Sequence, residues 1–315
     1  MNKQFFGLLT VMLTFWVSCS DNNLDTEQEE MVNFTIETAI PADITTYASH
    51  EGGIANVKSD KYSLRYIMEV WTQETPKRLA YRDTKIVPDF NVNGTNVTFT
   101  VQLLARIYDF VFWADFVDKG SPGVVDKFYN TNAKGLTLTD PGYLGLRDIQ
   151  IKSYAISNEA RDAFFAVKKN VDLSHSSRLY GGITLARPFG KYRVIATNTP
   201  STVSMDEIRI DYSVMGASAT LPAGFDALED TLTGVTIPAA IYPGKTIHDD
   251  VEAGGIVLAF DYIFVPESAP QTVRFNATVY DGTVATGASI GEFTIPNIRV
   301  ERNKLTTVVG KFFTN

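Results

Sequence analysis

Residues 96–104 read Asn-Val-Thr-Phe-Thr-Val-Gln-Leu-Leu, so that apolar side chains occupy every second position from Val97 through Phe99 and Val101 to Leu103. Successive side chains of a β-strand point to opposite faces, and this spacing therefore predicts a strand with one buried face. The preceding pair Asn93-Gly94 favours a tight hairpin turn. The same alternation recurs in five further segments, at residues 32–40, 64–70, 208–214, 256–264 and 273–279.

Most of the remaining chain also predicts strands. Residues 108–113 form a run that is apolar except for Asp109, of the kind found in strands that are buried on both faces. Asp281-Gly282 favours a second hairpin turn, and residues 293–295 and 305–313 are typical of closing strands. Only residues 158–165 favour a helix, of two turns, with Asn158 or Ser157 as its N-cap. Many short strands with turns between them predict an all-β protein built from sandwiches.

The length of 315 residues allows two such domains. Pro188 interrupts a β-like stretch that runs from residue 179 to residue 197, and a proline in the middle of a sheet removes a ladder hydrogen bond. We therefore expect an N-terminal sandwich over residues 31–188 and a C-terminal sandwich over residues 189–315.

The N-terminus has the features of an export signal. Lys3 precedes an apolar run over residues 5–17, which is shorter than the about 20 residues that cross a bilayer. The run ends at the only cysteine of the chain, Cys19, and Val17-Ser18-Cys19 resembles a bacterial lipobox. This predicts a lipoprotein signal peptide over residues 1–18, acyl chains such as palmitate on Cys19, and an acidic tether over residues 19–30. The alternative is an ordinary signal peptide whose cysteine is discarded.

A search for chemistry finds no constellation that singles out a reaction. The three histidines, His50, His175 and His248, are not spaced as metal ligands, and His248-Asp249-Asp250 is more typical of a solvated loop than of a cation site. We expect no G-x-S-x-G nucleophile elbow, P-loop or dinucleotide fingerprint. We therefore expect no cofactor, no metal and no enzymatic activity, although a glycosidase-type pair of carboxylates would form only in space. The net charge of −8 also argues against nucleic-acid binding.

Two further features have a structural and a functional interpretation. Trp71 and Trp113 lie in apolar strands, which favours a place in the core over a sugar-stacking platform. Asp230-Thr231-Leu232 matches the short O-glycosylation pattern of exported Bacteroidetes proteins, so Thr231 is a candidate for modification.

Three stretches of sequence occur together in a characteristic order. They are residues 110–115 (Phe-Val-Phe-Trp-Ala-Asp) with 129–131 (Tyr-Asn-Thr) and Leu136; residues 158–165 (Asn-Glu-Ala-Arg-Asp-Ala-Phe-Phe) leading to 183–190 (Ile-Thr-Leu-Ala-Arg-Pro-Phe-Gly); and residues 295–310, which end Arg-Asn-Lys-Leu-Thr-Thr-Val-Val-Gly. Together they resemble the fimbrillin (Mfa-like, type V pilin) superfamily of Bacteroidales surface lipoproteins. The resemblance implies two tandem transthyretin-like β-sandwich domains and a role as a pilus subunit or a pilus-associated adhesin.

The resemblance also implies a route of assembly. A trypsin-like protease cuts after the first strand, and a strand from a neighbouring subunit fills the groove that the lost strand leaves. The strand to be lost here is residues 31–40, and the candidate cleavage segment is residues 42–60. Members of this superfamily commonly carry an arginine just after that strand, whereas this sequence has Thr46-Tyr47; the first basic residues are Lys58 and Lys61. Arg65 lies inside the next predicted strand and should be protected. In the first strand, the apolar side chains that the groove would receive are Val32, Phe34, Ile36 and Ile40.

Two functions therefore stay open. The first is a fimbrillin-like subunit at the tip, anchor or an accessory position of a pilus, held to the outer membrane by its lipid and able to contact other subunits, a second copy, or a host protein or glycan. The second is a glycan-binding outer-membrane surface lipoprotein, for which an exposed coplanar pair of aromatic side chains would be the distinguishing feature.

Overall fold

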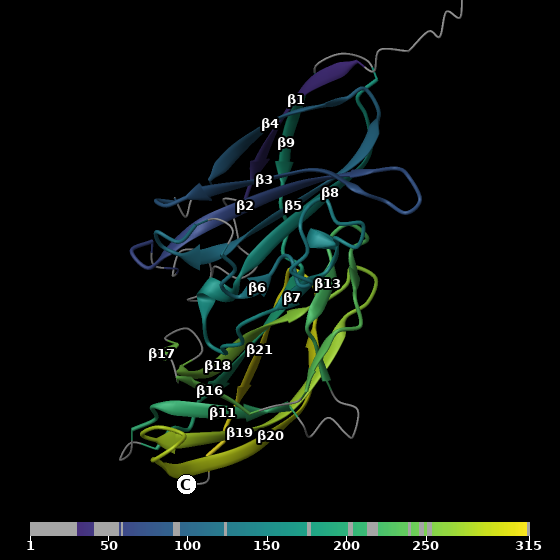
Figure 1. Ribbon diagram of the computed structural model, residues 1–315. Coiled ribbons are helices and arrows are strands. Elements are labelled where there is room, and N and C mark those ends of the chain that lie inside the picture. The colour runs from purple at the N-terminus through teal and green to yellow at the C-terminus, as the bar shows by residue number, and fades with distance from the viewer. Residues whose placement is uncertain are drawn as a thin grey trace, which may run out of the picture.

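The computed structural model confirms the all-β class (Figure 1). Among the residues that the structure describes, its elements are strands and short 3-10 turns such as η2 (Gly145–Arg147) and η3 (Glu159–Arg161). The residues that the structure describes are 30–40, 57, 59–90, 95–122, 125–174, 178–200, 204–212, 220–238, 241–245, 249–250 and 254–313.

Two sheets form the N-terminal half. The β1 sheet has the order β4-β1-β9, and the β5 sheet has the order β3-β2-β5-β8. They pack face to face, with the Phe34 and Phe110 rings 4.7 Å apart and the Phe99 and Phe112 rings 6.2 Å apart. The strands are β1 (Met31–Ala39), β2 (Tyr62–Thr72), β3 (Leu79–Val87), β4 (Asn96–Leu104), β5 (Ile107–Asp118), β8 (Ala163–Asp172) and β9 (Arg178–Thr184).

The β5 sheet is buried on both faces. One face of β5 meets the β1 sheet, and the other is covered by the segment 125–151, where the Trp113 and Tyr129 rings lie 5.4 Å apart. The apolar run predicted at residues 108–113 is therefore a doubly buried strand, as expected. The prediction of a half-buried strand at residues 64–70 is wrong, because the same extra layer buries both faces of β2.

Two sheets also form the C-terminal half. The β10 sheet has the order β17-β18-β10-β21, and the β19 sheet has the order β16-β11-β19-β20. Their inner faces meet in a second core, where the Tyr192 and Phe275 rings lie 5.4 Å apart. The strands are β10 (Phe189–Ala196), β11 (Glu207–Asp211), β16 (Ile241–Lys245), β17 (Asp249–Asp250), β18 (Gly255–Phe264), β19 (Gln271–Asp281), β20 (Ala288–Val300) and β21 (Leu305–Gly310), with β12 (Thr220–Pro222) and β15 (Thr236–Pro238) paired beside them.

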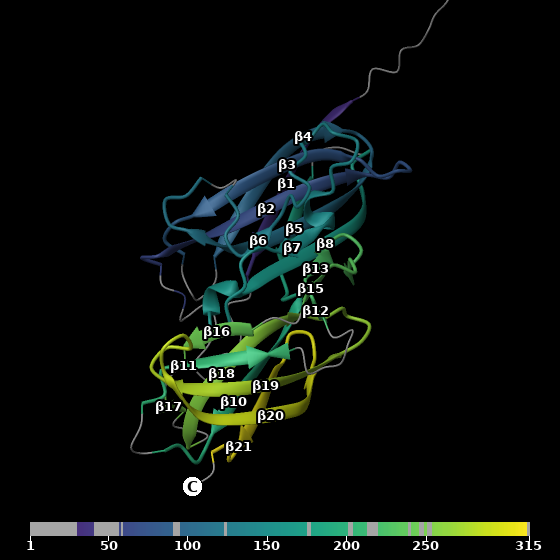
Figure 2. The ribbon, with the colours of Figure 1, turned by 60° about the horizontal axis from the view of Figure 1, so that its bottom comes forward.

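A small sheet joins the two halves (Figure 2). This junction sheet has the order β14-β13-β7-β6, and its strands are β6 (Tyr129–Asn130), β7 (Ile149–Ile151), β13 (Gly224–Asp226) and β14 (Thr231–Leu232). Phe225 of β13 is opposite Ile149 of β7, so residues from both sides of Pro188 share one ladder. Phe225 and Phe264 also belong to the N-terminal core. The two halves therefore have separate cores but a common boundary layer.

The predicted helix at residues 158–165 is wrong. Asn158 does cap a helical turn, its side chain accepting from the Ala160 N–H at 3.0 Å, but the turn is only η3. The chain then enters β8, and Ala163 to Phe165 pair with residues 113–115 of β5. Tertiary strand pairing outweighs the weak helix preference of this segment.

Of two predicted hairpin turns and two predicted strand ends, the structure describes one of each. The β19–β20 hairpin exists, with residues 282–287 in its turn and Gly282 at a φ of 93°. β21 ends at Gly310 and not at residue 313. Asn93-Gly94 and Val214 lie outside the described residues.

Candidate functional site

The first strand of the fold, β1, lies in the middle of its sheet. It pairs antiparallel with β4 along its whole length, from Met31 opposite Leu104 to Ala39 opposite Asn96. On its other side it pairs in parallel with β9, from Phe34 opposite Arg178 to Ala39 opposite Thr184. If β1 were removed, two strand edges would be left unpaired, one antiparallel and one parallel to the missing strand.

The inward face of β1 fills a groove between the two N-terminal sheets. Phe34 and Ile36 are 0% and 1% exposed, and Val32 and Ile40 are 4% and 3% exposed. Thr38 is also buried, and its hydroxyl donates to the Val97 carbonyl at 3.0 Å, so that this polar group is satisfied. The four apolar residues predicted to enter the groove therefore do lie in it.

The predicted processing residues follow β1 in the chain. Lys58, with the segment 41–56, lies outside the described residues. Lys61 is exposed in the turn before β2, and its carbonyl accepts from the Lys119 N–H at 2.9 Å. Arg65 is 0% exposed inside β2, as predicted. Of the candidate residues that are described, Lys61 alone is therefore placed where a protease can reach it.

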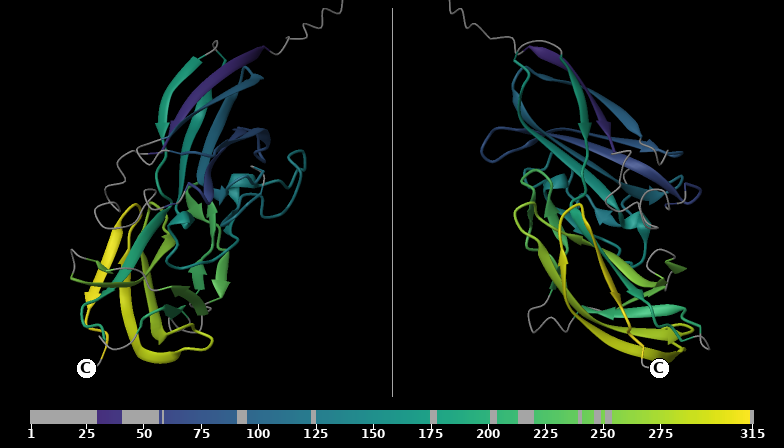
Figure 3. Two further views of the ribbon diagram at one scale, coloured as in Figure 1. Left: turned by 90° about the vertical axis from the view of Figure 1, so that its left-hand side faces the viewer. Right: turned by 180° about the vertical axis from the view of Figure 1, so that it is seen from behind.

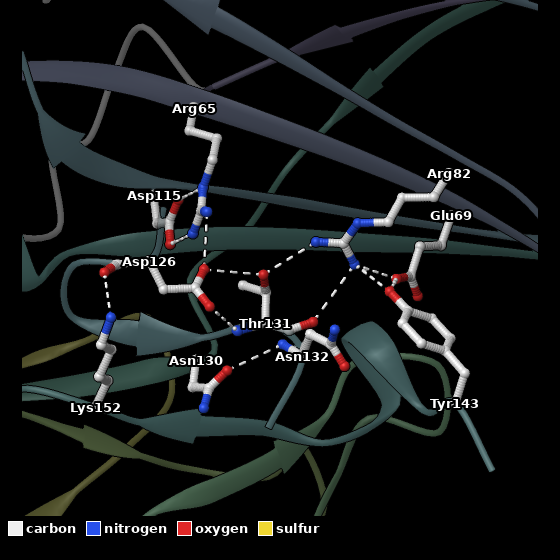
Figure 4. A network of polar contacts seen from close by, with 10 residues as sticks. All are labelled: Arg65, Glu69, Arg82, Asp115, Asp126, Asn130, Thr131, Asn132, Tyr143 and Lys152. Atoms are coloured by element: carbon white, nitrogen blue, oxygen red, sulfur yellow. Dashed lines mark hydrogen bonds and ion pairs between the residues drawn. The ribbon is translucent and has the colours of Figure 1, made fainter. Parts of the chain in front are cut away.

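Arg65 is the centre of a buried ionic cluster behind the groove (Figure 4). Its Nε and Nη2 donate to Asp115 at 2.8 and 2.6 Å, and its Nη1 lies 2.8 Å from Asp126 Oδ1. Burial lowers the pKa of Arg65, but the two carboxylates outweigh burial and the pKa is raised. Asp126 also accepts from the backbone N–H and the hydroxyl of Thr131, both at 3.0 Å. The cluster thus fastens the segment that covers the outer face of the β5 sheet.

A second buried cluster holds the other end of the same segment (Figure 4). Glu69 pairs with Arg82 and accepts from the Tyr143 hydroxyl at 2.9 Å, the Leu146 N–H at 3.0 Å and the Trp71 indole at 3.1 Å. Burial raises the pKa of Glu69, while Arg82 and the other donors oppose the rise. Every oxygen of this carboxylate is used by the protein itself, so the site has no free group to offer a substrate.

Ionic contacts also cross the junction between the two halves. Arg161 pairs with Asp261, and both side chains are 1% exposed or less. Asp261 additionally accepts from the hydroxyls of Tyr212, at 2.8 Å, and Tyr154. Because Arg161 follows β7 and Asp261 lies in β18, this cluster ties the N-terminal half to the C-terminal half.

Two more ion pairs lie beside it. Arg187 donates three hydrogen bonds to Asp162, at 2.6 to 2.8 Å. Lys191 Nζ lies 2.7 and 2.9 Å from the two oxygens of Glu159 and 4.1 Å from the centre of the Phe260 ring. Burial lowers the pKa of Lys191, against the attraction of Glu159. Such pairs cost much to break, because a single buried charge would remain.

The geometry does not assemble a reaction centre from these groups. The buried acids and bases of these clusters are paired with each other, and no group of His, Cys, Asp and Glu in the described ranges is arranged to hold a metal ion. His50, His175 and His248 lie outside the described residues. Residues 287–291, Gly-Ala-Ser-Ile-Gly, match the G-x-S-x-G pattern of hydrolase nucleophile elbows, which the sequence search overlooked. Ser289 lies near the start of β20 and not in the strand-to-helix turn that such an elbow requires.

A family model described as a family of unknown function, DUF6562, matches residues 25–315. The chain belongs to this family. No curated protein matches it.

Several solved structures are similar to this DUF6562 family member. The tip fimbrial protein Mfa3 from Porphyromonas gingivalis is 12% identical, with a TM-score of 0.46, over 91% of this chain and 96% of that one. The fimbrial anchor protein Mfa2 from the same organism is 12% identical, with a TM-score of 0.45, over 84% and 82%. Putative polysaccharide binding proteins from Bacteroides thetaiotaomicron are 12% identical, with a TM-score of 0.46, over 83% and 80%. These structures include fimbrial proteins, the group that the three sequence stretches resemble.

The remaining predicted sites of this family member are the lipidation site, the glycosylation site and the two tryptophans. Cys19 lies outside the described residues. Thr231 is exposed at the start of β14, and its neighbour Asp230 is held by Arg302. Trp71 and Trp113 are both 0% exposed, which confirms their place in the core. Where the structure describes the chain, no helix is both long enough and apolar enough to span a membrane.

The residues that sequence reasoning missed are the charged ones of the junction. Arg161, Asp162 and Arg187 lie inside the stretches that resemble fimbrillins, yet the sequence analysis assigned them no role. Arg302, from the third stretch, also reaches this region and lies 5.0 Å from the centre of the Phe165 ring. A signal was available, because charged residues flanked by apolar runs are buried only when they have partners.

Proposed function

We propose that this protein is a fimbrillin-like surface subunit, at the tip, anchor or an accessory position of a pilus, and not an enzyme. In this proposal β1 is the exchangeable part: after cleavage behind it, a strand of another subunit or of a second copy takes its place. The observation that carries the proposal is the central position of β1, with ladders on both sides and a buried apolar face.

The energetics favour replacement over simple loss. Val32, Phe34, Ile36 and Ile40 are almost fully buried, and burying four such side chains stabilises by roughly 6–12 kcal/mol, at about 1.5–3 kcal/mol each. A whole domain is stable by only about 5–15 kcal/mol. A subunit that lost β1 would therefore need another strand in the groove to stay folded.

The proposal includes the location. The lipid predicted on Cys19 would hold the chain to the outer membrane, and the acidic residues 19–30 would separate the body from the bilayer. β1 begins directly after this tether, so cleavage behind β1 would free the body from its covalent anchor. Modification of Thr231 is compatible with its exposure and remains a prediction.

A glycan-binding function has less support. A sugar platform needs exposed aromatic faces, whereas the most exposed large apolar side chains of the described residues are Met31, Ile107, Val125, Leu138 and Val309. None of these five side chains is aromatic.

Limited trypsin digestion tests the proposal. The chain from residue 20 would be digested, the new N-terminus mapped by mass spectrometry, and the product run unheated on a denaturing gel. We expect a cut at Lys58 or Lys61 and a ladder of detergent-resistant oligomers. The double variant Lys58→Gln/Lys61→Gln should yield neither, while Lys134→Gln, at an exposed turn lysine, should behave like the unmodified chain.

Either of two results would count against strand replacement. One is a monomer that resists trypsin in the segment behind β1. The other is a clean cut that produces no oligomers at any protein concentration, which would favour a lone surface binder.

A further inference from the structure

Two parallel strand pairs lie at opposite ends of the molecule. β1 pairs in parallel with β9 in the N-terminal half, and β21 pairs in parallel with β10 in the C-terminal half. β9 leads directly into β10, so that these two strands follow one another from one end of the molecule to the other (Figure 3).

The two outer strands run in a fixed direction relative to the connector at residues 185–188. β1 points toward it, because the carbonyl of Ala39, its last residue, accepts from the Leu185 N–H at 2.9 Å. β21 leads away from it, because the Lys304 carbonyl just before β21 accepts from the Lys191 N–H at 2.9 Å. Met31 and Gly310 are therefore the two residues farthest from the connector along the paired strands.

The connector is held along its whole length. Ala186 and Phe165 exchange two backbone hydrogen bonds at 2.8 and 2.9 Å. The Arg187 side chain is held by Asp162, and the Pro188 carbonyl accepts from the Val265 N–H at 3.0 Å. A linker between independent domains would be exposed and would lack such contacts.

We propose that the protein is built to carry tension between its ends along one path, from β1 through β9 and β10 to β21. A pull on Met31 drags β1 lengthwise against β9 and β4, and a pull on Gly310 drags β21 lengthwise against β10. In this shear geometry the hydrogen bonds of a ladder are loaded together, whereas a sideways pull opens them one after another. The ladder between β10 and β21 has six residue pairs, and the pairs of β1 with β4 and β9 share the load at the other end.

On this path, the buried ion pairs of the junction would hold the connector in place under tension. Tension passes from β9 to β10 through four residues, and Arg187 is 2% exposed among them. The pairs of Arg187 with Asp162 and of Lys191 with Glu159 fix the connector and the start of β10 to one segment, residues 159–162, just before β8. The inference does not depend on strand replacement at β1, because a replacing strand would be loaded in the same groove.

Single-molecule force spectroscopy on the full chain tests the proposal. Cys19→Ser removes the natural thiol, and pairs of new cysteines then serve as handles. The end-to-end variant carries Glu30→Cys and Lys311→Cys. The comparison variant carries Ala285→Cys and Lys311→Cys; its handles lie at one end, because the β19–β20 turn is close to Gly291, which lies next to the Phe313 ring.

We expect the end-to-end pull to give one rupture at several-fold higher force, with no extension released before it. The same-end pull should peel β21 at low force and release up to roughly 90 Å, the span of residues 285–311 at about 3.3–3.6 Å each. Equal forces in the two geometries, or an early low-force release from either end in the end-to-end pull, would overturn the proposal.

A variant pair tests the part played by the connector. Asp162→Asn with Arg187→Gln removes both charges together, so that no lone charge is buried. We expect this double variant to rupture at lower force end to end. The control is Lys169→Gln with Glu229→Gln, a half-exposed ion pair away from the path, which should leave the force unchanged. A folded connector variant with undiminished rupture force would refute the assignment of load to these residues.

Discussion

Truncation of Phe34 to alanine is the sharpest test of the β1 groove. The side chain is 0% exposed, and its ring lies 4.7 Å from the Phe110 ring of the facing sheet. Its neighbour Thr35 points to the other side of the strand, where its hydroxyl lies 3.3 Å from the Thr100 hydroxyl on the surface. Phe34→Ala and Thr35→Ala therefore form a matched pair within one strand.

The two substitutions are expected to lower the free energy of unfolding by amounts that differ several-fold. Removing a buried phenylalanine side chain costs about 3–5 kcal/mol, because the apolar contact is lost and a cavity remains. Removing one partner of an exposed cross-strand threonine pair costs roughly 0.2–1 kcal/mol. The ratio of these two costs in unfolding free energy depends on which face of β1 is buried, so a register slip by one residue would exchange the costs of Phe34→Ala and Thr35→Ala.

Urea unfolding followed by tryptophan fluorescence measures this difference, since Trp71 and Trp113 are both in the N-terminal core. With a denaturant slope of about 3 kcal/mol per molar, Phe34→Ala should lower the midpoint by about 1–1.7 M. Thr35→Ala should lower it by about 0.3 M or less. In a chain cut behind β1, the same 3–5 kcal/mol should also speed release of the Phe34→Ala strand by roughly 10²- to 4 × 10³-fold.

Equal midpoint shifts for the two variants, or a larger shift for Thr35→Ala than for Phe34→Ala, would contradict this assignment of the buried face. Either result would mean that β1 does not bury its even-numbered face.

Three further outcomes follow from particular contacts. Gly145→Ala should destabilise strongly, because Gly145 has a φ of 50° and an added Cβ would overlap a buried carboxylate; Gly135→Ala, at a φ of 62° but with no atom nearby, should cost less in the same denaturation assay. Burial raises the pKa of Asp109, but the hydrogen bonds to its carboxylate outweigh burial and lower the pKa overall. The stability that the ionised Asp109 contributes is therefore present above the unfolded pKa, near 4, and is lost as the pH falls through the lower pKa of the folded state. Asp109→Asn should remove this loss of stability at acid pH from a pH series of thermal melts. Gly291→Ala should displace the C-terminal Phe313 ring, which lies 2.6 Å from where the new methyl would be, and proteolysis of the C-terminal end should become faster than in the unmodified chain.

Local patterns in the sequence predict much of the strand content. A strand with one solvent-exposed face can be recognised from its own sequence, as at Val97 to Leu103. Its side chains alternate between core and solvent, and this alternation does not depend on which strands lie beside it. The predictions failed where contacts with distant segments outweighed the local pattern. β2 is buried on both faces because the segment 125–151 covers the β5 sheet, and the residues after Asn158 form a strand because β5 offers them a ladder.

Part of the groove filled by β1 could be predicted from the sequence. The sequence indicated which residues of β1 face inward, because alternation is a property of the strand itself. It could not indicate that β1 lies between β4 and β9, since strand order depends on contacts between residues far apart in the chain.

The sequence by itself therefore determined the all-β class, the apolar face of the first strand and the core position of Trp71 and Trp113, because each follows from local spacing and hydrophobicity. Only the tertiary structure decided the parallel pairings of β1 with β9 and β21 with β10, and the ion pairs of Arg161 and Arg187. A buried charge is stable only opposite a partner, and the partner of Arg161 is 100 residues away in the chain. No local pattern can carry that information, so it appears only when the chain has folded.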